Sequence, residues 1–148
     1  MRKSKSQFIR HHSLSIAAIM LLILWIVLYS VSDPGTHLGS FFGNAIADWF
    51  GVVVMIVATK HLYEKGSAES RRPPNLPLEP MLAKLRDHSL TIFLLVTGAG
   101  WIALYAALDS QGKWGQVVGN LVSQWTQLFG LVILTKKLIE WHSKESKR

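Results

Sequence analysis

The sequence contains no cysteine among its 148 residues. Disulfides, thiol nucleophiles and thiolate metal sites are therefore excluded. The chain also lacks a phosphate-binding loop, a dinucleotide-binding fingerprint, a zinc-protease helix and a serine nucleophile elbow. From these absences we expect no enzymatic activity, no cofactor and no bound metal.

Charge is scarce as well, at 17% of the residues, whereas 49% are hydrophobic. The apolar residues fall into four blocks, at about 13–31, 41–59, 89–108 and 116–135. Each block is long enough to span a hydrocarbon core of ~30 Å as an α-helix, and Asp48 is the only charged residue within them. We therefore predict an all-α integral membrane protein with four transmembrane helices in a single domain, residues 1–148. The first block is too long for a signal peptide and is expected to be an uncleaved helix.

The net charge of +7 is confined to particular segments. The two short connections contain only Lys113, and every other Lys and Arg lies before the first block, between the second and third, or after the fourth. By the positive-inside rule, both termini and the central linker are cytoplasmic. We therefore expect a multi-pass protein of the bacterial inner membrane whose basic segments meet anionic lipids, and no nucleic-acid partner.

The two halves of the sequence are similar, which indicates an internal duplication. The segment "RHHSLSI" from Arg10 matches "RDHSLTI" from Arg86, and the offset of 76 positions holds without a gap to the end of the sequence. The predicted repeats are residues 10–72 and 86–148, separated by a linker at 73–85. A short interfacial helix is expected at about 80–87. Each repeat crosses the membrane twice, so the two hairpins are parallel and related by a pseudo-two-fold axis along the membrane normal.

The segment "KGSAES", residues 65–70, follows the second apolar block, and that block begins with a polar stretch containing Trp49. This pattern resembles a group of small uncharacterised bacterial four-helix membrane proteins. The resemblance covers most of the chain and implies the same topology. It brings no activity with it.

Polar residues form one stripe on each of the second and fourth predicted crossings. At 100° per residue, Asn44 and Asp48 share a stripe, and Asn120, Gln124 and Gln127 share the equivalent one. A carboxylate at this depth costs about 2–3 kcal/mol on insertion and needs a partner, water or a proton. The stripe therefore indicates a polar pathway or ion-binding site. The alternative is that these side chains only join helices through hydrogen bonds.

Small residues form a second pattern, which favours close helix packing between the repeats or between two copies. The segment at 97–100, "TGAG", aligns with the bulky "LLIL" at 21–24, so we expect the third crossing to be central and the first to be peripheral. The helix-packing residues are Gly43, Ala47, Gly51, Gly119 and Ser123.

A third polar group is expected at the cytoplasmic ends of the helices. Its arginines and glutamates are predicted to form ion pairs, and the alternative is a metal site or a pH sensor. The residues are Arg10, His12 and Glu64 in the first repeat and Arg86, His88 and Glu140 in the second.

Two functions remain. The first is a channel or carrier for a small cation or polar solute that moves along the stripe. The alternative is a non-transporting accessory subunit or scaffold. Four helices are few for enclosing a pore, so transport requires a dimer or larger. The apolar surface of the chain and its duplicated hairpin lead us to expect a homo-oligomer, a dimer or larger, in either case. The sequence identifies no protein partner.

Overall fold

The computed structural model describes residues 2–138 and 141–144, and within these residues every regular element is a helix. The helices are α1 (Arg2–Val31), α2 (His37–His61), α3 (Pro80–Asp87), α4 (Ser89–Ala107) and α5 (Lys113–Leu134). Four of them contain stretches long and apolar enough to cross a membrane, at Gln7–Val31, His37–His61, Ser89–Ala107 and Lys113–Leu134. The predicted all-helical class with four long apolar helices is thereby confirmed.

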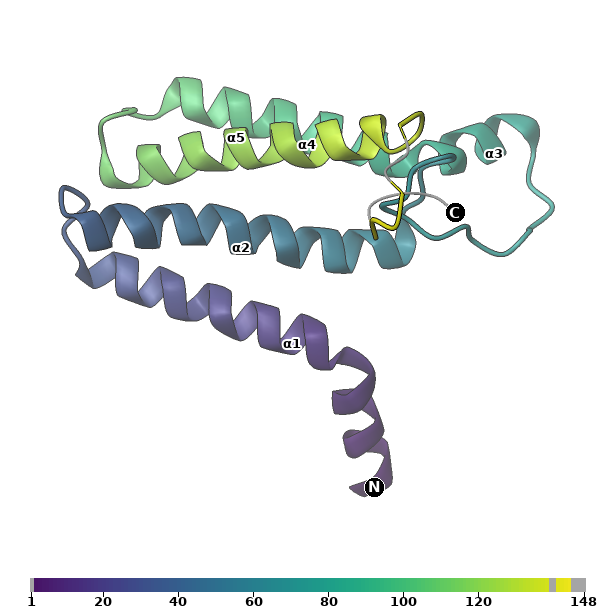
Figure 1. Cartoon of the computed structure of the whole chain (residues 1–148), viewed down its shortest axis with the longest axis horizontal. Helices are drawn as coiled ribbons and strands as arrows, with labels where there is room; N and C mark the ends of the chain where they lie inside the picture. The colour runs from purple at the N-terminus through teal and green to yellow at the C-terminus, as the bar shows by residue number, and fades with distance from the viewer. Residues whose placement is uncertain (1, 139–140, 145–148) are drawn as a thin grey trace.

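The four long helices lie in a row rather than around a centre. Helix α1 packs on α2, α2 on α5 and α5 on α4, while the first turns of α1 point away from the other helices (Figure 1). Helices α2 and α5 therefore occupy the middle of the row. The expectation that the third crossing is central was wrong, because α4 lies at the end of the row and contacts mainly α5.

The small residues of α4 explain this difference only in part. A methyl group built on Gly98 would lie 3.3 Å from Cδ1 of Trp125, so Gly98 faces α5. The same construction on Gly100 meets no atom within 4 Å. The "TGAG" segment thus provides one close contact with α5 and an open surface on its other side.

The two connections between paired helices are equally tight. A Cβ atom on Gly39 would lie 1.9 Å from the carbonyl oxygen of Asp33, and one on Gly115 would lie 1.9 Å from that of Asp109. Only glycine permits this approach of backbone to backbone. In the first connection, Thr36 also caps α2 by accepting a hydrogen bond from the Gly39 N–H at 3.0 Å.

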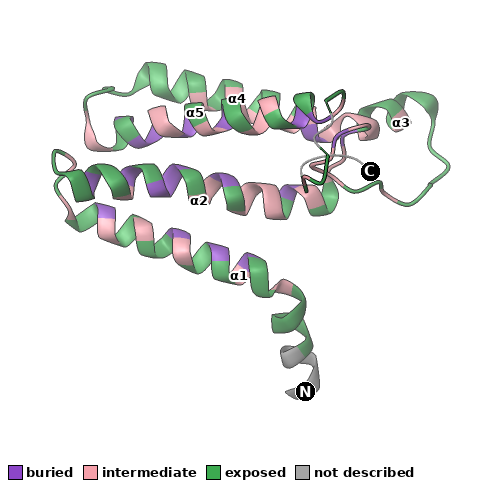
Figure 2. Ribbon diagram, viewed as in Figure 1, coloured by how far each residue is buried: buried purple, intermediate pink, exposed green. Residues whose placement is uncertain are grey.

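Aromatic packing fills the space between α2, α4 and α5. Phe50 contacts Trp101 and Trp125 at ring-centroid distances of 5.7 and 5.8 Å, and the two tryptophans lie 5.7 Å apart. The indole N–H of Trp125 donates to the Thr97 hydroxyl at 2.8 Å, so its polar atom is satisfied. Buried residues follow the inner faces of α2 and α5, and much of α1 and α4 is exposed (Figure 2).

The segment between α2 and α4 contains no helix until α3. Pro80 is the first residue of α3, where its missing N–H needs no partner. The apolar side chains Met81, Leu82 and Leu85 are all exposed on this helix. Helix α3 occupies the stretch in which the sequence predicts a short helix, and its placement on a membrane surface stays a prediction.

Candidate functional site

The polar stripe follows the seam between α2 and α5. The side-chain amide nitrogen of Asn120 donates a hydrogen bond to the side-chain oxygen of Asn44 at 2.6 Å. The two asparagines therefore face each other across the seam. Each asparagine provides the other with a hydrogen-bond partner. Apolar surroundings offer no such partner to an amide group.

Gln124 packs over a glycine further along the same seam. A Cβ atom on Gly51 would lie 2.7 Å from Nε2 and 2.8 Å from Cγ of Gln124. The absence of a side chain at position 51 therefore creates the space that the glutamine occupies. Gly51 is buried and Gln124 is half-buried, so this is a packing contact as well as a polar position.

Asp48 lies between these two contacts along α2. On a helix, positions 44, 48 and 51 fall within about 60° of arc, so Asp48 belongs to the same seam. Its side chain is exposed, and within the part of the chain that the structure describes it forms no hydrogen bond or ion pair. Ser123 and Gln127 are exposed on α5. The seam thus has one bonded polar pair and an exposed surface that carries a carboxylate.

The remaining small residues pack mainly within each pair of helices. A Cβ atom on Gly43 would lie 3.1 Å from the Tyr29 ring, and one on Gly119 would lie 3.0 Å from the Tyr105 ring. Ala47 is 1% exposed and belongs to the core. Gly43 and Gly119 therefore let a tyrosine of the preceding helix approach the backbone, whereas Gly51 serves the contact between α2 and α5.

Tyr29 also joins α1 to the start of α5. Its hydroxyl donates to the carbonyl oxygen of Lys113 at 2.5 Å, and the Lys113 ammonium donates to the carbonyl oxygens of Ser30 and Ser32 at 3.0 and 2.7 Å. The ammonium thus binds one carbonyl in the last turn of α1 and one just after the helix, where carbonyls lack a partner within the helix. This contact ties the end of α1 to the start of α5.

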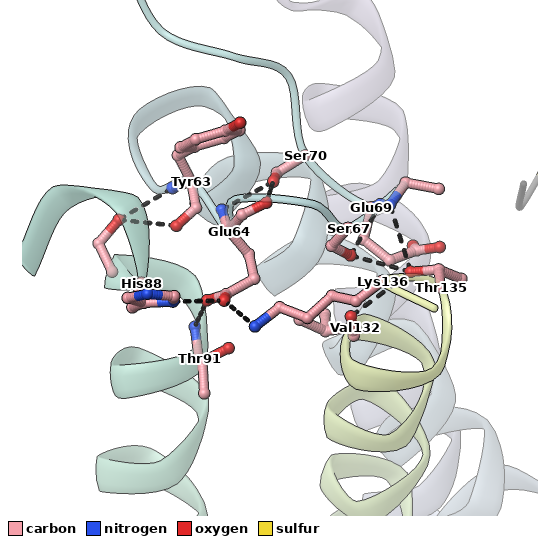
Figure 3. Close-up of polar contacts among 12 residues, drawn as sticks. Tyr63, Glu64, Ser67, Glu69, Ser70, His88, Thr91, Val132, Thr135 and Lys136 are labelled. Carbon is pink, nitrogen blue, oxygen red and sulfur yellow. Dashed lines mark hydrogen bonds and ion pairs between the residues drawn. The ribbon is translucent and has the colours of Figure 1, made fainter. Parts of the chain in front are cut away.

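A glutamate is completely buried at the opposite ends of the helices. Glu64 has no exposed surface, and its carboxylate pairs with the Lys136 ammonium (Figure 3). It also accepts hydrogen bonds from Nδ1 of His88 at 2.7 Å and from the backbone N–H of Thr91 at 3.2 Å. We name Glu64, His88, Thr91 and Lys136 the Glu64 cluster. It connects the segment after α2 with the start of α4 and the end of α5.

The surrounding backbone fixes the glutamate in place. The Leu90 N–H donates to the carbonyl oxygen of Tyr63 at 3.1 Å, and the Lys65 N–H donates to that of Asp87 at 2.7 Å. The Ser70 hydroxyl accepts from the Glu64 N–H at 2.9 Å.

The "KGSAES" segment holds the end of α5. The hydroxyl groups of Ser67 and Thr135 share a hydrogen bond of 2.9 Å (Figure 3), and the N–H of Ala68 also donates to Thr135 at 3.2 Å. Both hydroxyl-bearing residues are buried. The segment is therefore a packed structural element.

Competing effects act on the ionisation of Glu64. Burial raises the pKa of its carboxyl group, but the hydrogen bonds from Lys136, Thr91 and His88 and the Lys136 charge outweigh burial. The pKa of Glu64 accordingly lies below its ordinary value of 4.5. The cluster holds an ionised carboxylate and stabilises the fold at neutral pH.

The structure brings only part of the predicted cytoplasmic group together. Glu64 and His88 meet, but Arg86 pairs with Asp87 at 3.2 Å and Arg10 is exposed, so the expected arginine–glutamate pairing at Glu64 is replaced by Lys136 and His88. His12 is half-buried and contacts the ring of Phe8. Glu140 lies outside the described residues.

Sequence reasoning missed Lys136 as a member of the cluster. Lys60 and Lys136 occupy equivalent positions of the two predicted repeats, and this sequence match was the available signal. The equivalence extends further, because the Lys60 ammonium donates to the Ser15 hydroxyl at 2.8 Å, and Ser15 is the counterpart of Thr91.

Among the described residues, no group of three or more His, Asp or Glu side chains is arranged to hold a metal ion. No family model, curated protein or solved structure matches the chain.

Proposed function

We propose that this chain is a bacterial inner-membrane protein built from two parallel hairpin repeats, with both termini in the cytoplasm. The equivalent contacts of the two halves support the repeat. Gly39 and Gly115 approach Asp33 and Asp109 at the same distance, and two tyrosines cover two glycines in the same way. The hydrogen bond between Asn44 and Asn120 is the contact expected beside a two-fold axis between α2 and α5. The basic segments support the orientation.

We further propose that copies of the chain assemble along the α2–α5 seam and form a polar pathway for a small cation or polar solute. The observation that carries this proposal is the exposed, unbonded carboxylate of Asp48 in the middle of an apolar helix. A free carboxylate at this depth is costly in lipid. Water or a transported cation beside Asp48 removes that cost. Because the four helices lie in a row, a second copy of the chain is needed to complete the wall of the pathway.

In this proposal Asp48 supplies the negative charge. Asn44, Gln124 and Gln127 supply amide oxygens and N–H groups on the same face. A cation that sheds part of its hydration shell requires such oxygen ligands. The pathway requires no catalytic chemistry and no cofactor.

The test is ion flux through purified protein in liposomes, with K⁺, Na⁺ and H⁺ gradients. The wild type should give flux, and Asp48→Asn should reduce it at least tenfold while leaving the fold intact. Asp109→Asn is a matched control, because Asp109 is exposed at the α4–α5 connection outside the apolar spans. It should retain most of the flux. If no ion moves with the wild type, the proposal of a cation pathway is contradicted.

The second candidate is a non-transporting scaffold or accessory subunit. The packing of Gln124 on Gly51 and the bonded asparagine pair favour it, because both show polar side chains used in helix contacts. For a scaffold, Asp48→Asn changes the oligomeric state or thermal stability and no flux is seen for any ion.

A further inference from the structure

A cavity of about 580 Å³ lies at the end of α2, next to the Glu64 cluster. Its walls come from the last residues of α2 and from the segment that follows, up to Pro74. The apolar span of α2 ends at His61, so the cavity lies at the depth of the lipid headgroups in a membrane. This volume is in the range of small-molecule sites.

The lining of the cavity is strongly basic. Lys60, Arg71 and Arg72 line it and are exposed, and Glu69 is the only carboxylate among the lining residues. Glu69 is half-buried. The three cations therefore leave a net positive cavity. None of these three has a carboxylate partner within the described part of the chain.

The cavity is held in shape by contacts that do not involve its cations. The Glu64 N–H donates to the hydroxyl of Ser70, which also lines the cavity. Pro73 and Pro74 restrict the backbone immediately after the arginine pair. Arg72 also lines a neighbouring cavity of about 360 Å³ with Lys65, Arg86 and Asp87. Asp87 pairs with both Lys65 and Arg86 there, so Arg72 is the lining cation of that cavity with no ion pair in the described part of the chain.

We propose that the larger cavity binds the phosphate headgroup of an anionic phospholipid in the leaflet that contains the end of α2. Guanidinium groups bind phosphate oxygens in a bidentate manner, and Arg71 and Arg72 provide two of them. Lys60 also lines the cavity, and its ammonium, which donates to the Ser15 hydroxyl on α1, adds a third positive charge at the helix end. A basic cavity beside membrane helices at headgroup depth is a recurrent arrangement for binding acidic lipids. This inference does not depend on transport.

The test is native mass spectrometry of the full chain in detergent, titrated with phosphatidylglycerol or phosphatidylcholine. The double variant R71Q/R72Q removes two charges from the cavity. The charge-matched control K84Q/K137Q removes two exposed charges that do not line it. All side chains changed are exposed, and thermal unfolding in phosphatidylcholine should confirm that both variants remain folded.

We expect the wild type to prefer phosphatidylglycerol and R71Q/R72Q to bind it at least tenfold more weakly. The control should stay within about twofold of the wild type. Equal losses in both double variants would show attraction by overall charge and overturn the site. Displacement of the lipid by an equal concentration of inorganic phosphate would show a site for free anions and overturn the lipid assignment.

Discussion

The side chains of Asn44 and Asn120 are joined by a hydrogen bond of 2.6 Å, and the two residues lie 76 positions apart. This separation is the repeat offset found in the sequence. The bond therefore connects equivalent positions of the two predicted repeats and lies in the seam between α2 and α5. Asp48, one helical turn further along, is displayed beside this bond.

The asparagine pair should contribute measurably to stability. Replacing either residue with alanine should lower the free energy of unfolding by about 0.6 kcal/mol, the average for hydrogen bonds between membrane helices. The double variant should lose less than the sum of the two single variants, because both remove the same bond. Unfolding of all four proteins in mixed micelles gives the coupling energy. Strict additivity would mean that the bond does not form in the membrane.

A methyl group at position 51 should destabilise the contact between α2 and α5. It would lie 2.8 Å from Cγ of Gln124, so Gly51→Ala forces that side chain to move. We expect a loss of about 1–2 kcal/mol in the free energy of unfolding, as for overpacked interiors. Adding Gln124→Ala removes the clashing atoms and should recover most of this loss.

Gly130→Ala is the matched control for position 51. Gly130 lies in α5, and a Cβ atom there meets nothing within 4 Å. It should be neutral or slightly stabilising, because alanine favours helix over glycine. A loss at position 130 equal to that at position 51 would contradict the packing account.

Glu64 should make stability depend on pH. Its pKa is lower in the folded chain than the ordinary value of 4.5, so folding favours the ionised form. The resulting stability is fully present above pH 4.5 and is lost as the pH falls from that value through the folded-state pKa. Thermal unfolding between pH 3 and pH 7 should show this decrease in the wild type. Glu64→Gln should remove that part of the pH dependence.

The same substitution should be costly at pH 7. It leaves the Lys136 ammonium without its carboxylate partner. The free energy of unfolding should fall by about 3 kcal/mol, the lower end of the range for a broken buried ion pair. The lower end applies because the Lys136 side chain is 23% exposed. The exposed Glu79 provides the control, and Glu79→Gln should leave both stability and its pH dependence unchanged. An unchanged pH dependence in Glu64→Gln would contradict the role assigned to the cluster.

The number, length and apolar character of the helices could be predicted from the sequence, because each of these follows from local composition. The order of the helices in the row could not. Small residues at Gly98 and Gly100 suggested a central helix, yet only the first of them faces another helix. Which side of a uniformly apolar helix is covered depends on the neighbour's shape, and Trp125 on α5 decides it here.

The stripe was visible in the sequence because helical periodicity places its residues on one face. The sequence did not show which residues of the stripe bond to each other and which stay exposed. Asn44 and Asn120 are bonded, while Asp48 forms no hydrogen bond or ion pair within the described residues. The Glu64 cluster was found only in part, because Lys136 lies 72 positions beyond Glu64 and no local pattern links them. Only the sequence match with Lys60 at the predicted repeat offset distinguished Lys136 from the other lysines.

In the proposed pathway, water reaches the Asp48 face of the seam within the membrane. The chain has no cysteine, so single cysteines can be introduced without background labelling. Ser123→Cys places a thiol beside the seam, and Val96→Cys places one on the exposed surface of α4 within its apolar span. The measurement is the rate of modification by a charged methanethiosulfonate reagent in liposomes, which requires a hydrated, ionisable thiol. We expect modification of Ser123→Cys to be at least tenfold faster than that of Val96→Cys. Equally slow rates at both positions would contradict a hydrated Asp48 face.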